Sequence, residues 1–493
     1  MEKDKGSEIV IELDGLMIKC SEGENLAEVL QGAQIPIIRL CCEESTNNRG
    51  HCNLCLAENC VTGEIFRTCE VTINSEMHLS VNSKQVQIAI KESMAKLLSG
   101  HPALCNECIK LGECQLQESF RKLPFELAQK ITIFASKESK GQIVDLGKNI
   151  VFDEKFCIAC GRCVAFLANF TKSNEIRPPV ENEDEWRRPL PSPLKNEYVL
   201  NLPELCPTAA LSEVTNSRPS PLPLPYSHTT ICIGCPATCP ATLEFDNWGP
   251  VRLRPIPSSM KKSRWMCDFG RKIVGGYKYT QRLHEIVENY NGSFSVTEVG
   301  PLIERIRRRD LKLVLPLDLF NEEYEFFFKM AKKYSFKISF FKWPNSGADF
   351  DGILKRGSHN CNEKGMEAVW KRFRDFGLVL AEEQFFEGLS KTDVVLMVLP
   401  EIISDSNFLF DYVGRLGRAD FKVAFSVTDS LHVQKEFNYL FPASAFFEKN
   451  GTVTNVYGED SVLRFANWPF EKQFFKERGE SLITRHLSSI LGT

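Results

Sequence analysis

Fifteen of the 19 cysteines and one histidine fall into four sets of four soft metal ligands between residues 41 and 267. The sets read C-x10-C-x2-C-x13-C, H-x3-C-x2-C-x5-C, C-x2-C-x2-C-x42-C and C-x2-C-x3-C-x27-C. Their members are Cys41, Cys52, Cys55 and Cys69; His101, Cys105, Cys108 and Cys114; Cys157, Cys160, Cys163 and Cys206; and Cys232, Cys235, Cys239 and Cys267. Cysteines two or three residues apart let thiolates converge on neighbouring corners of one cluster, while backbone N–H groups point at its sulfides. The spacing therefore predicts four iron–sulfur clusters.

Two ligand positions need an argument beyond spacing. Cys42 stands beside Cys41, and by spacing alone either could be the first ligand. A lone histidine is usually a core or helix-end residue, but His101 stands four residues before C-x2-C-x5-C. We therefore predict that it is a fourth ligand, which being uncharged would change the charge and potential of its site. The remaining cysteines are expected to be ordinary thiols.

Composition narrows the class of protein. The chain has 493 residues, 43% of them apolar, which allows several domains with separate cores. A net charge of −4 and a pI near 6.2 argue against nucleic acid as the main partner. The start, MEKDKGSEIV, has no apolar signal region, and no apolar run approaches the ~20 residues that span a bilayer. We expect a cytoplasmic protein whose cysteines bind metal rather than form disulfides.

The elements around the cysteines are those of small electron-transfer domains. Residues 8–20 alternate apolar and polar around Asp14-Gly15, which predicts a β-hairpin, and 24–34 predict a short helix, as in the plant-type ferredoxin β-grasp. Residues 83–99 predict an amphipathic helix that leads to His101. Residues 149–166 predict a strand, a cysteine loop and a helix, which is half of a bacterial-type ferredoxin unit.

The sequence pattern changes in the part of the chain beyond the third set. A Pro-rich stretch at 218–227 predicts a domain boundary. Farther on, continuous apolar strands alternate with helices and predict a buried parallel sheet; the strands are 311–317, 336–341, 393–400 and 421–427, and the helices 322–334 and 405–416. The chain has no G-x-G-x-x-G, no G-x-x-x-x-G-K-[ST], no G-x-S-x-G and no H-E-x-x-H. No catalytic residue of the acid–base or nucleophile kind is therefore assigned.

The four motifs in this order resemble one family, the large iron–sulfur subunit (the G subunit) of NADH:quinone oxidoreductase, which is respiratory complex I. The stretches that carry the resemblance are IPIIRLCCEESTNNRGHCNLC, HPALCNECIKLGECQLQ, CIACGRCVAF with LCPTAAL, and CIGCPATC with RWMCDFGR. The resemblance implies one [2Fe–2S] cluster on the first set, with Cys41 as the first ligand, and a [4Fe–4S] cluster on each of the other three. The fourth set resembles the cluster site that opens molybdopterin oxidoreductases.

The resemblance also implies a fold and a domain order. The expected fold class is α+β iron–sulfur domains followed by a truncated α/β domain like that of molybdopterin oxidoreductases, without a molybdopterin. The expected domains are a [2Fe–2S] β-grasp domain at 1–80, a helical [4Fe–4S] domain with one histidine and three cysteine ligands at 81–120, a four-Cys ferredoxin-like domain at 121–217, a molybdopterin-oxidoreductase-type [4Fe–4S] domain at 225–280 and an α/β scaffold at 281–493. FPASAFFEKNGTVTN (441–455) is similar to a segment of that superfamily.

The implied function is electron relay from NADH toward quinone. The implied partners are an NADH/FMN-binding subunit with its thioredoxin-like [2Fe–2S] companion, and the ferredoxin-like and quinone-site subunits of the peripheral arm. The expected location is the cytoplasmic side of a bacterial inner membrane, reached only through other subunits.

Other protein classes explain the residues less completely. An iron-only hydrogenase needs a further cysteine constellation, and only Cys361 follows Cys267. A formate dehydrogenase needs a molybdenum ligand motif and a longer chain, so an electron-transfer subunit associated with either enzyme is the alternative function. Structural zinc sites are usually built from C-x2-C pairs or Cys/His mixtures, which C-x2-C-x2-C does not fit.

Overall fold

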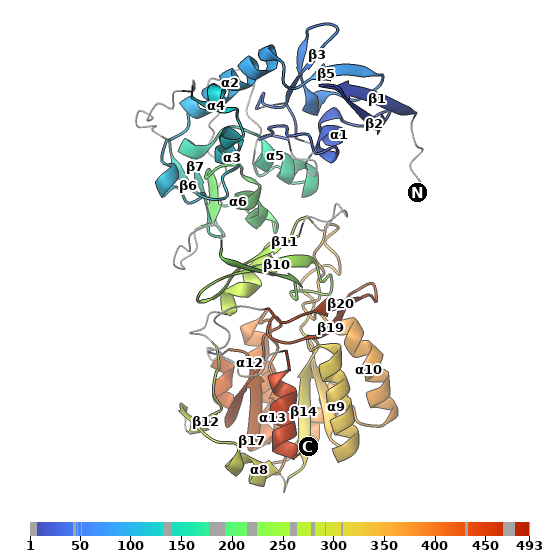
Figure 1. The fold of residues 1–493 in the computed structure, drawn as a ribbon. Helices are drawn as coiled ribbons and strands as arrows, with labels where there is room; N and C mark the ends of the chain where they lie inside the picture. Colours follow the sequence, from blue (N-terminus) through green and yellow to red (C-terminus); the bar gives the residue numbers. More distant parts are fainter. Residues whose placement is uncertain are drawn as a thin grey trace. The chain divides into compact units, whose positions relative to one another are not determined.

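The structure is a computed structural model that describes residues 7–42, 46, 48–50, 52–129, 131, 141–176, 193–213, 224–256, 264–277, 282–290, 292–306, 309–428, 432–466 and 479–492. It separates into two compact units, Met1–Pro223 and Leu224–Thr493, which divide inside the Pro-rich stretch (Figure 1). The finer division into five domains remains a prediction. Residues 177–192, which contain most of the prolines between Cys163 and Cys206, lie outside the described residues.

Unit 1 opens with a five-stranded sheet in the order β2-β1-β5-β3-β4. Its elements are β1 (Glu8–Leu13), β2 (Leu16–Ser21), α1 (Leu26–Gly32), β3 (Leu56–Asn59), β4 (Ile65–Arg67) and β5 (Met77–Ser80). The predicted hairpin is confirmed, with left-handed φ at Asp14 (48°) and Gly15 (85°) as a two-residue turn requires. Helix α1 begins two residues later than predicted, because Asn25 is extended and forms a bridge with Thr72.

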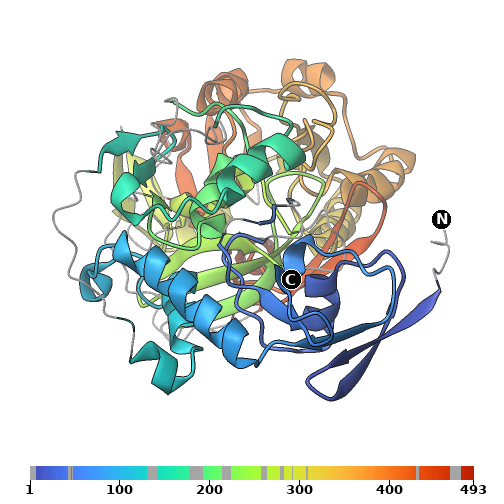
Figure 2. The same ribbon diagram turned by 90° about the horizontal axis from the view of Figure 1, so that it is seen from above.

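The rest of unit 1 is mainly short elements between long loops. They are α2 (Lys84–Ser99), α3 (Gln115–Arg121), α4 (Phe125–Ala128), β6 (Ile143–Asp145), β7 (Ile150–Asp153), α5 (Arg162–Ala165), α6 (Leu202–Leu205) and β8 (Leu211–Glu213). The Ser83 side chain accepts a hydrogen bond from Val86 N–H and so begins α2 where the sequence predicts. Helix α2, light blue in Figure 2, packs against β3 of the same unit.

Unit 2 begins with a three-stranded antiparallel sheet, β9 (Tyr226–Ile231), β10 (Pro240–Asp246) and β11 (Gly249–Pro255), followed by α7 (Asp268–Lys272). A seven-stranded sheet follows in the order β13-β12-β18-β17-β16-β14-β15. Its strands are β12 (Val287–Tyr290), β13 (Ser293–Val296), β14 (Leu311–Pro316), β15 (Lys337–Phe341), β16 (Val394–Val398), β17 (Phe421–Ser426) and β18 (Tyr439–Pro442). Strands β14 to β18 are parallel, which confirms the predicted parallel sheet.

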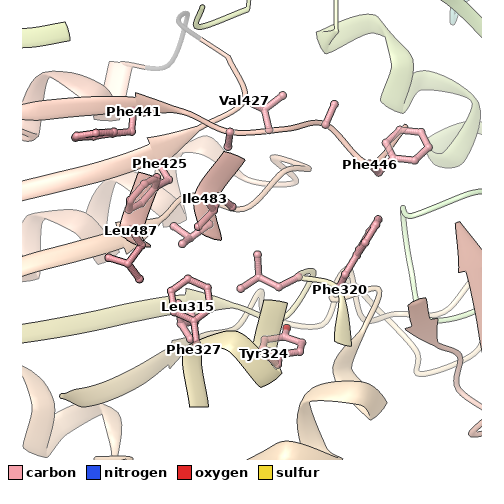
Figure 3. Close-up of a cluster of buried hydrophobic side chains, with 14 of the residues drawn as sticks. Leu315, Phe320, Tyr324, Phe327, Phe425, Val427, Phe441, Phe446, Ile483 and Leu487 are labelled. Atoms are coloured by element: carbon pink, nitrogen blue, oxygen red, sulfur yellow. The ribbon is translucent and has the colours of Figure 1, made fainter. Parts of the chain in front are cut away.

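Helices cover both faces of this sheet, because successive strand residues point to opposite sides. Leu313 and Leu315 face one core and Val314 the other. The first core includes side chains of α8 (Gly300–Ile306), α9 (Asn321–Tyr334), α10 (Glu363–Asp375) and α13 (Leu482–Leu491); the second includes those of α11 (Glu382–Glu387) and α12 (Ser406–Gly414). Figure 3 shows Phe425 and Phe441 near Ile483 and Leu487 of α13 in the first core.

The order of the parallel strands locates a switch point. Strands β15, β14, β16, β17 and β18 lie in the order 2-1-3-4-5, that of a doubly wound α/β fold. The order reverses between β14 and β16, and in such folds ligands bind beyond the carboxyl ends of the strands at this point. A hairpin of β19 (Gly451–Thr454) and β20 (Asp460–Leu463) follows β18. The α/β class of this half is confirmed, whereas its relation to molybdopterin oxidoreductases remains a prediction.

Candidate metal centres

The first set lies on the loop after α1 and at the end of β4, and all four of its cysteines are buried. The Sγ atoms of Cys41 and Cys52 are 3.4 Å apart, and Cys52 N–H donates to Cys41 Sγ. A hydrogen bond from Cys69 lowers the pKa of Cys55 to about 7 despite burial, and Cys41 lies near enough to raise it in part. Cys41 thus meets Cys52, whereas the neighbouring Cys42 packs with Cys55 and Cys69, and the choice of Cys41 as the ligand remains a prediction.

The second set is more open. The Cys105 side chain is exposed, and those of Cys108 and Cys114 are half-buried. Burial raises the pKa of Cys114, and the charges of Cys108 and Cys105 raise it further, so the three thiols lie close together. The imidazole of His101 meets the ring of Phe156 edge-on at 5.6 Å between centroids. Its Nδ1 is buried and has no hydrogen-bond partner among the described residues.

The third set converges from a tight loop before α5 and from the end of α6. Burial raises the pKa of Cys160 to about 12, and the charges of Cys206 and Cys157 add to this effect. Burial also raises the pKa of Cys163, and the charges of the other three thiols raise it further. The loop is strained, since Ala159 has φ of 52°, a left-handed conformation that non-glycine residues rarely adopt. This strain and the closeness of the four thiols indicate that the loop serves a site.

The third set lies between the first and the second. The Asn48 side-chain amide donates 2.7 Å hydrogen bonds to two carbonyls, that of Cys41 in the first set and that of Cys160 in the third. On the other side, the carbonyl of Pro207, next to Cys206, accepts a 2.9 Å hydrogen bond from Gln115 N–H, next to Cys114. The three candidate sites of unit 1 are therefore contiguous, with the four-Cys set in the middle.

The fourth set forms its own site in unit 2. Its cysteines come from the turn between β9 and β10 and from the start of α7. Burial raises the pKa of Cys232, and the charges of Cys267, Cys239 and Cys235 raise it further, so all four thiols lie within one another's field. Gly270 lies against this site, because a Cβ atom there would stand 2.8 Å from Cys232 Sγ.

Backbone N–H groups donate to sulfur in all four sets. The donor–sulfur distances are 3.4 to 3.5 Å for Cys52 to Cys41, Lys110 to Cys108, Gln117 to Cys114, Ala159 to Cys157, Gly234 to Cys232 and Gly270 to Cys267. Such bonds stabilise thiolates and tune cluster potentials. Within the described residues, no three His, Cys, Asp or Glu side chains are arranged to hold one metal ion. The converging sulfurs, their backbone N–H donors and the unpartnered Nδ1 of His101 are suited to hold polynuclear clusters.

Replacing His101 with alanine is expected to remove or weaken only the second cluster, because three thiolates remain there and the other sets are untouched. Burial lowers the pKa of His101, which keeps its imidazole neutral and able to bind iron near pH 7. EPR spectra of the reduced chain measure the change, with His228, which is half-buried as His101 is, replaced by alanine as the control. Unchanged signals from the second cluster would show that the ligand assignment is wrong.

The switch point of the large sheet holds two acids, Asp318, which is buried, and Glu401, which is half-buried. Glu401, just beyond β16, accepts hydrogen bonds from Tyr277 Oη–H (2.9 Å) and Phe446 N–H (2.6 Å), and Glu401 N–H donates to Asp318 (2.8 Å). All these donors are neutral. Burial raises the pKa of Glu401 to about 7 and that of Asp318 to about 6. Both acids thus retain protons in the folded chain at pH values where exposed acids have lost them.

Unit 2 is expected to lose stability as pH rises from about 4 to 7, because the folded acids bind protons that the unfolded acids release near pH 4. Above about pH 7 this contribution is constant. Hydrogen exchange of peptides from β14 and β16, compared at pH 5 and pH 8, measures it. Glu401→Gln should flatten the dependence, whereas the exposed Glu383→Gln should preserve it; an equal slope in both variants would contradict the assignment.

Comparison with known proteins agrees with these sites. Residues 6–84 match the model of a 2Fe-2S iron–sulfur cluster binding domain, and residues 147–212 match the ferredoxin-like domain of NADH-quinone oxidoreductase subunit 3. The first match contains the whole first set, and the second contains the whole third set. The chain is therefore an iron–sulfur protein built in part on ferredoxin-type domains.

Curated relatives narrow the family. The NADH-quinone oxidoreductase G subunit of Rickettsia conorii is 27% identical over 58% of this chain and 42% of its own length. The same subunit of Pseudomonas fluorescens is 24% identical over 55% of this chain and 30% of its own length. The mitochondrial NADH-ubiquinone oxidoreductase 78 kDa subunit of Candida albicans is 22% identical over 56% of this chain and 38% of its own length. Over more than half of its length the chain is homologous to the G subunit, as its motifs predict. It spans less than half the length of these relatives.

A chain of an NAD+-reducing [NiFe]-hydrogenase is 20% identical with a TM-score of 0.36, over 43% of this chain and 91% of that one, a likeness too slight to support an inference. No helix in the described part of the chain is long and apolar enough to cross a membrane.

Proposed function

We propose that this chain is an electron-transfer subunit of NADH:quinone oxidoreductase, with one [2Fe–2S] and three [4Fe–4S] clusters held by the four sets. The observation that carries the proposal is the contiguity of the three sites in unit 1. The Asn48 bridge joins the first site to the third, and the Gln115–Pro207 bond joins the third to the second. Electrons would therefore pass from the first site through the third to the second.

The chain's own residues set the conditions for this transfer. Buried cysteines with a backbone N–H donor would hold the first site, and half-buried ones with such a donor would hold most of the third. The neutral His101 would make the second site less negative. Cys105 is exposed, so the second site is the one open to solvent and to a following electron acceptor. The clusters would supply one-electron chemistry, and no residue of the chain is assigned to hydride transfer.

The proposed partners follow from this direction of flow. An NADH/FMN-binding subunit with its thioredoxin-like [2Fe–2S] companion would deliver electrons to the first site. A ferredoxin-like subunit would take them from the second site toward the quinone-site subunits. We place the chain on the cytoplasmic side of a bacterial inner membrane, held there by these subunits. Neither nucleic acid nor molybdopterin is part of the proposal.

Unit 2 is proposed to be a molybdopterin-oxidoreductase-type scaffold. The segment 441–455 supports this, because it contributes Phe446 and Lys449 to the switch point of the large sheet. There the chain's own side chains cover the carboxyl ends of β14 and β16. The fourth site lies in the same unit and is not part of the proposed three-site path.

The direct test is to interrupt the path in its middle. In the complex with the flavin subunit, Cys160→Ala should leave the first cluster reducible by NADH and leave the second cluster oxidised on the millisecond timescale. Freeze-quench EPR follows both signals, and chemical reduction by dithionite shows that the second cluster is still present. The exposed Cys60→Ala is the matched control. Equally fast reduction of the second cluster in Cys160→Ala would contradict the proposed path.

A further inference from the structure

Arg162 connects the three candidate sites of unit 1. It lies between Cys160 and Cys163, and only 4% of it is exposed. Its Nη1 donates to Gln115 Oε1 at 2.8 Å and to the Leu205 carbonyl at 3.3 Å, and its Nη2 donates to the Cys42 carbonyl at 3.4 Å. Gln115 follows Cys114, Leu205 precedes Cys206 and Cys42 follows Cys41. One guanidinium therefore touches segments that carry members of three different sets.

This buried cation lacks a matching anion among the described side chains. All three acceptors are neutral, an amide oxygen and two carbonyls. Its Nε is buried without a hydrogen-bond partner, and no described carboxylate forms an ion pair with it. Burying a charge is costly unless it is paired, and such a residue usually has a counter-charge nearby. Among the described residues no carboxylate supplies the matching negative charge, whereas the ligand sets beside Arg162 would.

Thiolate-ligated clusters would supply that charge. A cluster held by four thiolates is anionic, and reduction adds one more negative charge. A nearby cation stabilises the reduced form more than the oxidised form, and so raises the reduction potential. The Arg162 charge already favours the thiolate of Cys160, which shows that its field reaches the third set.

We propose that Arg162 is the shared counter-cation of the three clusters in unit 1, raising the reduction potential of each and most strongly that of the third. The inference rests on the proposed function, since it needs clusters at these sites. Arg162 would be a positioning and tuning residue that touches the segments bearing the ligands. Its hydrogen bonds all lie within unit 1, and the fourth set has its own cationic neighbours, Lys355 and Arg356.

The test is an EPR-monitored redox titration of the full chain, loaded with iron and sulfide under anaerobic conditions. Arg162→Gln should lower the potential of the third cluster most and those of the first and second by less, with the fourth unchanged as an internal reference. Arg162→Lys cannot make all three hydrogen bonds, but it keeps the positive charge. The reduction potentials of this variant should therefore lie close to those of the wild-type chain. Arg121→Gln, which removes an exposed arginine paired with Glu118, is the matched control and should shift none.

Each outcome decides the proposal. If Arg162→Lys shifts the potentials as far as Arg162→Gln, or if Arg162→Gln shifts none, charge is not the role of Arg162. If Arg162→Gln fails to hold its clusters, the test depends on Arg162→Lys. Wild-type reduction potentials in Arg162→Lys would support the charge role, and lowered potentials would overturn it. Absence of iron from the wild-type sites would instead contradict the proposed function.

Discussion

Replacing Gly270 with alanine is expected to empty the fourth site and lower the iron content by about four atoms per chain. The new Cβ would lie 2.8 Å from Cys232 Sγ, closer than a Cβ atom approaches any neighbour. Gly270 N–H also donates to Cys267 Sγ, so the backbone cannot withdraw without losing that bond. Because Cys232 would be fixed by iron, it cannot yield as a flexible side chain would. Iron analysis and EPR of the reduced chain measure the loss.

The matched control is Gly275→Ala. Gly275 lies five residues beyond Gly270, in the 3-10 helix that follows α7, and a Cβ atom there would meet nothing within 4 Å. This variant should keep its full iron content. Alanine favours a helix over glycine by about 1 kcal/mol, so a general loss of stability is not expected from either change. A Gly270→Ala chain with a filled fourth site would mean that Cys232 is not a ligand.

Replacing Lys449 with methionine is expected to destabilise unit 2 by about 3–5 kcal/mol, because it leaves the buried carboxylate of Glu323 without its cation. Lys449 Nζ lies 3.0 and 2.9 Å from the two carboxylate oxygens of Glu323, and both side chains are only 3% exposed. Glu323 also accepts a hydrogen bond from Phe320 N–H at the start of α9. Urea dependence of hydrogen exchange in peptides from α9 and β19 measures the loss.

A second variant separates the lost pair from lost packing. The double change Glu323→Gln and Lys449→Met should recover a large part of the stability, because no buried charge then remains. The exposed pair Lys364–Glu367 on α10 provides the control, and Lys364→Met should cost far less stability than Lys449→Met. If Lys449→Met and Lys364→Met cost the same, the pair does not stabilise the switch point of the sheet.

Much of the fold could be predicted because its signals are local. The turn at Asp14-Gly15 fixes the first hairpin, and Ser83 fixes the start of α2. The apolar runs of β14, β16 and β17 have no solvent face, which is typical of buried parallel strands. The cysteine spacing in turn confined each predicted site to one short loop and one distant ligand.

Long-range contacts could not be predicted from spacing. Asn48 bridges Cys41 and Cys160, which are 119 positions apart, and nothing in its neighbourhood marks it as a link. Arg162 had a local signal, a charged residue inside C-x2-C-x2-C, but its reach to Gln115 and Cys42 depends on tertiary packing. The half-buried acid Glu401 follows an apolar strand like a surface residue, and only the tertiary structure shows its hydrogen bonds to Phe446 and Tyr277.

The central claim is that four clusters occupy the four sets. The most direct measurement is iron and acid-labile sulfide per anaerobically purified chain, with low-temperature EPR of the reduced protein. We predict about 14 iron atoms per chain and signals of both [2Fe–2S] and [4Fe–4S] clusters. A value near 10 would mean that one tetranuclear site is empty, and zinc in place of iron would contradict the account.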